Sequence, residues 1–155
     1  EHHQANPFAV GPSKLSTAPY VPGTKQLQGL RVLVCEDSAS IATLLEVVLN
    51  AAGATMTQCV NGLEGLRCFE EQNASGAPPD LVLMDMQMPI MDGYEATGHI
   101  KALRPDIPVV ALTAFALADD IDRCLDVGCD YYLTKPIQIE TFTEELRSIR
   151  ERLDV

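Results

Sequence analysis

Basic residues, long apolar runs and a secretory leader are scarce or missing in this sequence. Lys and Arg total 11 against 22 Asp and Glu, which gives a formal charge of −11. This excess of negative charge argues against a nucleic-acid ligand and favours partners that are basic or that bring a metal ion. No apolar stretch reaches the roughly 18 residues that a membrane span needs, and the N-terminus has no region typical of a signal peptide. We therefore expect a soluble, cytoplasmic segment without membrane contact.

Closely spaced cysteine pairs are also missing. The chain has five cysteines and no CxxC motif: Cys35, Cys59, Cys68, Cys124 and Cys129. Their odd number and their mostly apolar surroundings predict reduced, buried thiols, and they argue against a zinc site.

The composition is that of one globular domain with some additional chain. Of the 155 residues, 46% are hydrophobic, which is enough for a sizeable core. Residues 1–29 are rich in Pro, Gly and Ser and show no apolar period, so we interpret them as a flexible linker or a tag-derived leader. The chain begins with Glu1 and not with Met, which suggests a piece of a longer protein. We expect residues 30–155 to form the domain.

Short β-branched runs alternate with longer helical periods from Leu30 onward, which predicts an α/β fold with a doubly wound parallel sheet of five strands and five helices. The second strand is the least apolar, and we expect it at an edge. The predicted strands are Arg31–Cys35, Thr55–Cys59, Leu81–Met84, Val109–Leu112 and Tyr131–Leu133.

The helical stretches have their own start and stop signals. Asn61 and Asp92 are each followed three residues later by Glu, as in a capping box. Gly53, Pro105 and Gly128 are stop signals. The predicted helices begin near Ile41, Asn61, Asp92, Ala118 and Ile139, and the last one reaches Leu153.

Chemically useful side chains follow four of the five strands. In a parallel sheet the carboxyl ends of all strands meet at one edge, where open α/β folds bind ligands. The side chains brought together are those of Glu36, Asp37, Asp85, Thr113 and Lys135. Three neighbouring carboxylates need a compensating cation, and a site that offers only oxygen ligands favours Mg²⁺, which suggests phosphoryl chemistry.

Asp85 is the best-placed acceptor within this group, because it ends an apolar run, Leu81–Met84, that we expect to be the central strand. A carboxylate can become an acyl phosphate in covalent catalysis, while Lys135 and Thr113 could neutralise the phosphoryl oxygens. Simpler interpretations stay open for single residues: Asp85 could cap a turn, and Asp37 or Ser38 could cap the first helix.

These residues resemble the receiver domain of two-component response regulators over about Leu30 to Leu153. The motifs that carry the resemblance are VLVCED at 32–37, LMDMQMPIMDG at 83–93, ALTA at 111–114 and GCDYYLTKPI at 128–137. The resemblance implies a flavodoxin-like sheet with strand order 2-1-3-4-5.

The resemblance also implies a role for each residue. Asp85 accepts a phosphoryl group from a phosphohistidine, and the acceptor domain itself catalyses this transfer and the later dephosphorylation. Thr113 and Lys135 contact the phosphate, and Thr113 with Tyr132 switches the surface of the fourth helix, fifth strand and fifth helix. The implied Mg²⁺ ligands are Glu36, Asp37, Asp85 and the backbone carbonyl of Gln87.

The motif DMQMP at 85–89 resembles receivers at the C-terminus of hybrid sensor histidine kinases more than stand-alone regulators. The expected partner is a histidine kinase or a histidine phosphotransfer domain. The chain is expected to be a monomer or weak dimer, either free in the cytoplasm or as the cytoplasmic part of a membrane-bound sensor. Phe115 is bulky where many relatives have a smaller residue, which predicts slow dephosphorylation.

Two other functions compete with that of a phosphoacceptor. A Mg²⁺-dependent phosphatase with Asp85 as nucleophile would need a second acid two residues later, where this chain has Gln87. A phosphorylation-independent interaction domain would be expected to lose one of the acids or Lys135, and none is lost.

Overall fold

The computed structural model describes residues 26–114 and 117–153. Strands and helices alternate along the chain. The strands are β1 (Arg31–Cys35), β2 (Thr55–Cys59), β3 (Leu81–Asp85), β4 (Val109–Thr113) and β5 (Tyr131–Thr134). The helices are α1 (Ala39–Ala51), α2 (Gly62–Ala74), α3 (Gly93–Leu103), α4 (Ala118–Val127) and α5 (Ile139–Leu153).

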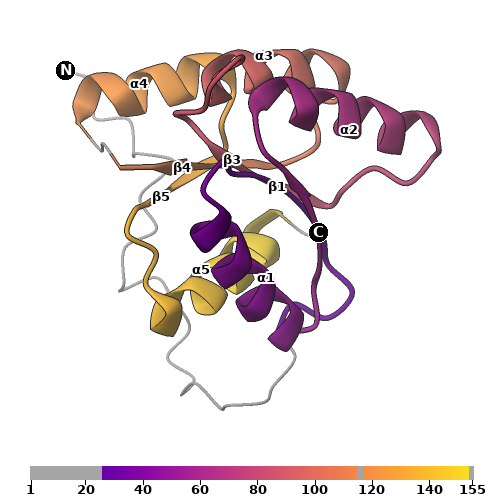
Figure 1. The fold of residues 1–155 in the computed structure, drawn as a ribbon, viewed down its shortest axis with the longest axis vertical. Coiled ribbons are helices and arrows are strands. Elements are labelled where there is room, and N and C mark those ends of the chain that lie inside the picture. Colours follow the sequence, from indigo (N-terminus) through magenta and orange to yellow (C-terminus); the bar gives the residue numbers. More distant parts are fainter. Residues whose placement is uncertain (1–25, 115–116, 154–155) are drawn as a thin grey trace.

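The five strands form one parallel sheet in the order β2-β1-β3-β4-β5, as predicted. Figure 1 shows three layers, with α2, α3 and α4 on one face of the sheet and α1 and α5 on the other. All connections between neighbouring parallel strands run through helices, so every strand ends at the same edge. This edge is where the predicted site residues meet.

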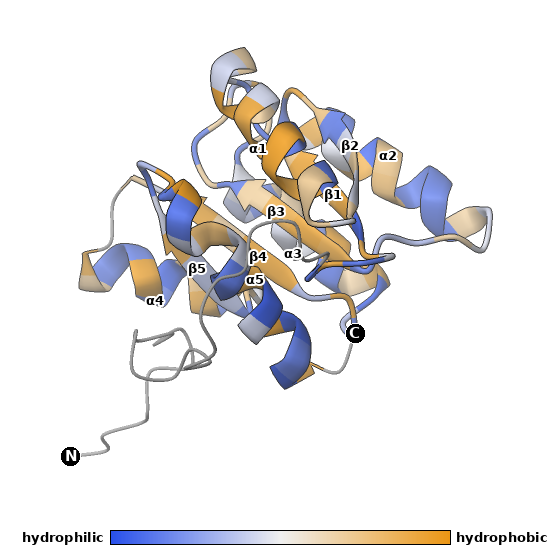
Figure 2. Ribbon diagram, turned by 90° about the horizontal axis from the view of Figure 1, so that it is seen from below, coloured by the Kyte–Doolittle hydropathy of each residue, from blue (hydrophilic) through white to orange (hydrophobic). Residues whose placement is uncertain are grey.

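Apolar strands fill the middle of the sheet (Figure 2). All five residues of β3 and of β4 are buried, whereas β2 buries only Cys59 and lies at an edge. A strand between two helical layers must be apolar on both sides, and β3 meets this condition up to its last residue, Asp85. The charge of Asp85 is therefore held at the boundary of the core.

Helix starts follow the predicted capping signals. The side chains of Asn61 and Asp92 accept hydrogen bonds from the backbone N–H groups of Glu64 and Glu95, at 2.8 and 2.9 Å. Ser38, one of the two residues considered as a cap for the first helix, does the same for α1. α4 ends at Gly128, whose φ of 104° is the left-handed conformation that glycine adopts without strain. No helix within the described ranges is long and apolar enough to cross a membrane.

Some boundaries differ from the sequence prediction. β3, β4 and β5 each extend one residue further than expected, because Asp85 pairs with Leu112 and Thr113 pairs with Thr134 in the sheet. Leu27 is fully buried and its N–H bonds the carbonyl of Ala52 at 2.8 Å, so packing begins before residue 30. Of the predicted linker at 1–29, residues 1–25 lie outside the described residues.

Candidate functional site

Three carboxylates converge at the carboxyl edge of the sheet. Glu36 and Asp37 directly follow β1, and Asp85 is the last residue of the adjacent strand β3. One oxygen from each lies within 4.8 Å of the others. Glu36 is fully buried and Asp85 is 4% exposed, while Asp37 is open to solvent. The predicted acidic cluster therefore forms, with two of its charges drawn into the domain.

Lys135 reaches this cluster from the segment after β5. Its ammonium nitrogen lies 2.8 Å from Glu36 Oε2 and donates a hydrogen bond to Asp85 Oδ2 at 3.1 Å. Lys135 keeps only 18% of its side-chain surface exposed. Burial opposes its charge, but the contacts with Glu36 and Asp85 outweigh burial and raise the pKa of Lys135 above its ordinary value. The lysine is thus fixed in its charged form between two acids.

Glu36 is the electrostatically strained member of the group. Burial raises the pKa of Glu36, and the neighbouring charge of Asp85 adds to this, while Lys135 and the Ser38 backbone N–H act against it. That N–H donates to Glu36 Oε1 at 3.1 Å. No sequence signal indicates this bond, although Ser38 itself is recognisable as a helix cap. A second cation beside Glu36 would remove the remaining cost of its charge.

The residues present fit a hard divalent cation. Glu36 Oε2 is buried, and its 2.8 Å ion pair with Lys135 falls outside hydrogen-bond geometry, so among the described residues no donor makes a proper hydrogen bond to it. A buried oxygen with a free lone pair, next to two further carboxylates and no nitrogen or sulfur ligand, is the donor set that Mg²⁺ prefers.

The backbone after β3 holds Asp85 in place. Asp85 Oδ1 accepts a hydrogen bond from the N–H of Gln87 at 3.0 Å, so the carboxylate caps the turn and also takes part in the cluster. Gly93, the first residue of α3, donates its N–H to the carbonyl of Met86 at 3.1 Å. A Cβ at Gly93 would lie 2.2 Å from the Asp85 carbonyl oxygen. Only glycine allows α3 to start this close to Asp85, a role that sequence reasoning missed.

The other predicted site residues lie on the same edge or next to it. Thr113 ends β4, is 4% exposed and accepts the Lys135 backbone N–H at its carbonyl, at 2.9 Å. Tyr132 on β5 is half-buried against the core, and its neighbour Tyr131 is buried, as the alternation along the strand predicted. Phe115 lies outside the described residues, so the expectation built on it stays a prediction.

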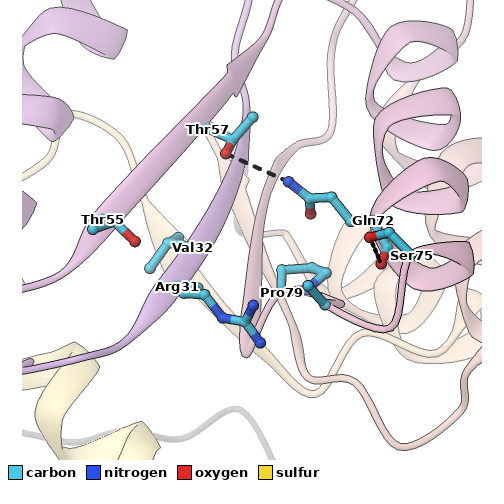
Figure 3. Close-up of a pocket in the computed structure, with 8 residues that line it drawn as sticks. Arg31, Val32, Thr55, Thr57, Gln72, Ser75 and Pro79 are labelled. Carbon is cyan, nitrogen blue, oxygen red and sulfur yellow. Dashed lines mark hydrogen bonds between the residues drawn. The ribbon is translucent and has the colours of Figure 1, made fainter.

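A cavity of about 240 Å³ lies at the opposite, amino edge of the sheet (Figure 3). Its lining includes Arg31 and Thr55 at the starts of β1 and β2, and Gln72 near the end of α2. The Gln72 side-chain N–H donates to Thr57 Oγ1 at 3.5 Å across it. No carboxylate of the acidic cluster lines it, so this groove is separate from the candidate site.

Comparisons with known proteins agree with this geometry. The chain is 35% identical to Histidine kinase 1 of Arabidopsis thaliana, in a match that covers 81% of this chain and 13% of that protein. It is 38% identical to the polar-differentiation response regulator DivK of Brucella anthropi, covering 76% of this chain and 93% of the regulator. The chain thus spans about an eighth of the length of the histidine kinase.

The solved structures that match it have the same fold. The receiver domain of the sensor histidine kinase PA1611 from Pseudomonas aeruginosa, which has a magnesium ion in its active-site cleft, aligns with a TM-score of 0.69 at 32% identity, over 82% of this chain and 99% of that one. A CheY-like receiver protein from Methanospirillum hungatei gives the same TM-score at 26% identity, over 81% and 94%. The profile of the family described as response regulator receiver domain matches residues 32–147. The chain therefore belongs to the receiver domains of two-component signalling.

Proposed function

We propose that Asp85 accepts a phosphoryl group from a phosphohistidine of a partner protein. The observation that carries the proposal is the buried arrangement of Lys135 between Glu36 and Asp85, at 2.8 and 3.1 Å. Such a group of charges is costly to bury. These buried charges do little for the stability of the fold. A site that binds a phosphoryl group together with a cation would explain why they are there.

The transfer needs little covalent chemistry from the protein. An Asp85 oxygen attacks phosphorus in line with the leaving imidazole nitrogen, so an O–P bond forms as the N–P bond breaks. Lys135, which already contacts Asp85 Oδ2 at 3.1 Å, would stay beside the new phosphate and pair with one of its oxygens. Thr113, at the end of the next strand, would donate its hydroxyl to another.

Mg²⁺ would be held by Glu36, Asp37, Asp85 and the backbone carbonyl of Gln87. When bound, the ion would supply positive charge to the phosphoryl oxygens and to the acids. The chain's own contribution is to hold these ligands: the Ser38 N–H fixes Glu36, and the Gln87 N–H fixes Asp85.

The response to phosphorylation would run through Thr113 and Tyr132. A new dianion at Asp85 attracts the Thr113 hydroxyl, and a displaced Thr113 changes the space beside Tyr132 on the adjacent strand β5. The surface of α4, β5 and α5 would then present a different shape to its partner.

The partner would be a histidine kinase or a histidine phosphotransfer domain, and the chain would be the receiver of a hybrid kinase. The identity to a much longer histidine kinase supports this. The formal charge of −11 supports protein partners over nucleic acid, and we expect a monomer or a weak dimer. The free thiols of all five cysteines fit a cytoplasmic location.

The competing functions are separable by experiment. The reduced protein is incubated with acetyl phosphate with and without Mg²⁺, and its intact mass is recorded. We expect one added phosphoryl group that requires Mg²⁺, is lost in Asp85→Asn and is retained in the matched control Asp80→Asn, on the opposite edge. Rapid turnover of small phosphomonoesters would favour a phosphatase instead, and the absence of any adduct would favour a phosphorylation-independent interaction domain.

A further inference from the structure

Two of the five cysteines face each other at the end of α4. Cys124 lies in the last turn of the helix, and Cys129 follows the left-handed Gly128. The N–H of Cys129 donates to the carbonyl of Cys124 at 3.0 Å, and the N–H of Gly128 bonds the carbonyl of Leu125 at the same distance. This is the Schellman motif, in which the side chains at the positions of Cys124 and Cys129 commonly pack against each other.

The geometry of this turn suits a disulfide. Disulfides join residues whose Cα atoms are roughly 4.4–6.8 Å apart, and a direct N–H to carbonyl bond between two residues keeps their Cα atoms near that range. Cys124 and Cys129 are 1% and 5% exposed, and their thiols are hydrogen-bonded to each other. Tyr94 and Thr97 of the neighbouring helix α3 are their other hydrogen-bond partners.

The surroundings favour one thiol as the nucleophile. A hydrogen bond from the Cys129 thiol lowers the pKa of Cys124 to about 7, against the effect of burial, and the Tyr94 hydroxyl adds a second donor. The hydrogen bond to Cys124 and burial raise the pKa of Cys129. Arg123 lies 3.9 Å from the centre of the Tyr94 ring and favours negative charge nearby.

α4 buries little of its own surface. Its only buried residue is Cys124, whereas α3 buries five residues. Its N-cap residue, Leu117, makes no side-chain hydrogen bond to the helix. A helix that buries so little apolar surface opens locally at a small fraction of the free energy of global unfolding.

We propose that Cys124 and Cys129 form an oxidation site that closes to a reversible intramolecular disulfide in the presence of a peroxide. The Cys124 thiolate attacks one peroxide oxygen, so an S–O bond forms and the O–O bond breaks. The hydroxide that is released takes up the proton lost from Cys124 and leaves as water. Cys129 then attacks the sulfur of the sulfenic acid, an S–S bond replaces the S–O bond, and the hydroxyl leaves as water with the Cys129 proton. The two thiols supply the two electrons that reduce the peroxide.

The other three cysteines serve as internal references. Cys35 and Cys59 are paired across β1 and β2 and are 0% and 2% exposed. Gly65 of α2 packs over them, since a Cβ there would lie 2.4 Å from Cys35 Sγ. Cys68 on α2 is the most exposed of the five. We expect the sheet pair to stay reduced and Cys68 to oxidise singly.

The test is a peptide map of the full chain after treatment with hydrogen peroxide, followed by alkylation. Cleavage after Arg123 releases a peptide that contains both Cys124 and Cys129. We expect this peptide to lose two hydrogens, to resist alkylation, and to take two alkyl groups after reduction with a thiol. The disulfide should disappear in Cys124→Ser and persist in the matched control Cys68→Ser.

The same map also gives the outcomes that would overturn the proposal. Full alkylation of both cysteines after peroxide treatment would do so, as would a disulfide that joins either of them to a third cysteine. Because the wild-type map stands without the variants, a poorly folded Cys124→Ser does not affect the result. The proposal does not depend on Asp85, so its failure would leave the phosphoacceptor function intact.

A second readout concerns the helix itself. A disulfide at its C-terminal turn should slow hydrogen exchange in α4 and leave α3 unchanged, because it ties the end of α4 to the start of β5. Unchanged exchange in α4 after confirmed disulfide formation would limit the site to a chemical modification without a structural effect, and would contradict that part of the proposal.

Discussion

At the carboxyl edge of the sheet a lysine is buried between two carboxylates, whereas at the amino edge an arginine meets one aspartate in solvent. Lys135 keeps 18% of its side chain exposed and lies 2.8 and 3.1 Å from Glu36 and Asp85. Arg31 and Asp80 are 49% and 37% exposed, and their charged groups are 3.8 Å apart.

The buried cluster at the carboxyl edge calls for a functional explanation, whereas the exposed pair at the amino edge is an ordinary surface ion pair. An exposed ion pair contributes at most about 1 kcal/mol and is screened by salt. Buried charges cost several kcal/mol each to desolvate, so a group of three is a weak source of stability. On the proposed function, the carboxyl edge gives up stability for phosphoryl transfer, and substitutions at the two edges test this contrast.

The largest effect is expected from glycine at the carboxyl edge. In Gly93→Ala the new Cβ would meet the Asp85 carbonyl oxygen at 2.2 Å, so α3 and the acceptor strand must separate. We expect the free energy of unfolding to fall by about 3 kcal/mol. At the amino edge, Gly76→Ala meets no atom within 4 Å and is strained only by its φ of +82°, which should cost about 1 kcal/mol. Urea titration of both variants gives the comparison, and equal losses would contradict it.

Removal of the buried ammonium comes next. Lys135→Met leaves Glu36 and Asp85 without compensation, and we expect a loss of about 2 kcal/mol in the absence of Mg²⁺. Mg²⁺ should restore part of that loss, and should do so to a greater degree than in the charge-conserving control Lys135→Arg. If the stability of the Met variant matched that of the wild type, or did not respond to Mg²⁺, the acids would not form one electrostatic group.

A substitution at Glu36 should have the opposite sign. Burial raises the pKa of Glu36 above its ordinary 4.5, so its protonated form stabilises the fold below that pH, and this contribution is lost as pH rises through the folded-state pKa. Glu36→Gln stays neutral. The variant should be more stable than the wild type at pH 7 without Mg²⁺, and the difference should shrink below pH 4.5.

The same variant should lose the stabilisation that Mg²⁺ gives to the wild type, because a metal ligand is removed. Thermal unfolding across a pH series, with and without Mg²⁺, measures both effects. A Gln variant less stable than the wild type at pH 7 in Mg²⁺-free buffer would show that Lys135 already compensates Glu36 fully.

The smallest effect belongs to the exposed pair. Arg31→Gln keeps the backbone bond from residue 31 to Asp80 Oδ2, at 2.9 Å, and removes only the ion pair. We expect a change below about 0.5 kcal/mol that disappears in high salt. If the free energy of unfolding fell by more than about 1 kcal/mol independently of salt, the exposed pair would behave like a buried one, and the contrast between the two edges would be wrong.

Much of this arrangement could be predicted from the sequence. Apolar runs such as Leu81–Met84 identify buried strands, and Asn61 and Asp92 mark helix starts where the structure has them. Strand ends in a parallel sheet share an edge, so the sequence alone predicts that Glu36, Asp85 and Lys135 meet.

The features that could not be predicted depend on how deeply a side chain is buried and on contacts between segments far apart in the sequence. The raised pKa of Glu36 needs its complete burial, and a sequence pattern does not give burial of a residue just past a strand. Gly93 looked like an ordinary helix start, because the close approach of the Asp85 carbonyl is a tertiary contact. Leu27 is an isolated apolar residue in a polar segment, so no periodicity indicated that it joins the core.

The most direct test of the account is to locate the phosphoryl group chemically. After incubation with acetyl phosphate and Mg²⁺, borohydride reduces an acyl phosphate to an alcohol, and the modified residue is then identified by sequencing of the peptide by mass spectrometry. The account predicts conversion of Asp85, and of no other acid in the cluster, to homoserine. Modification at Asp37 or Glu36, or at a histidine or serine elsewhere in the chain, would contradict it.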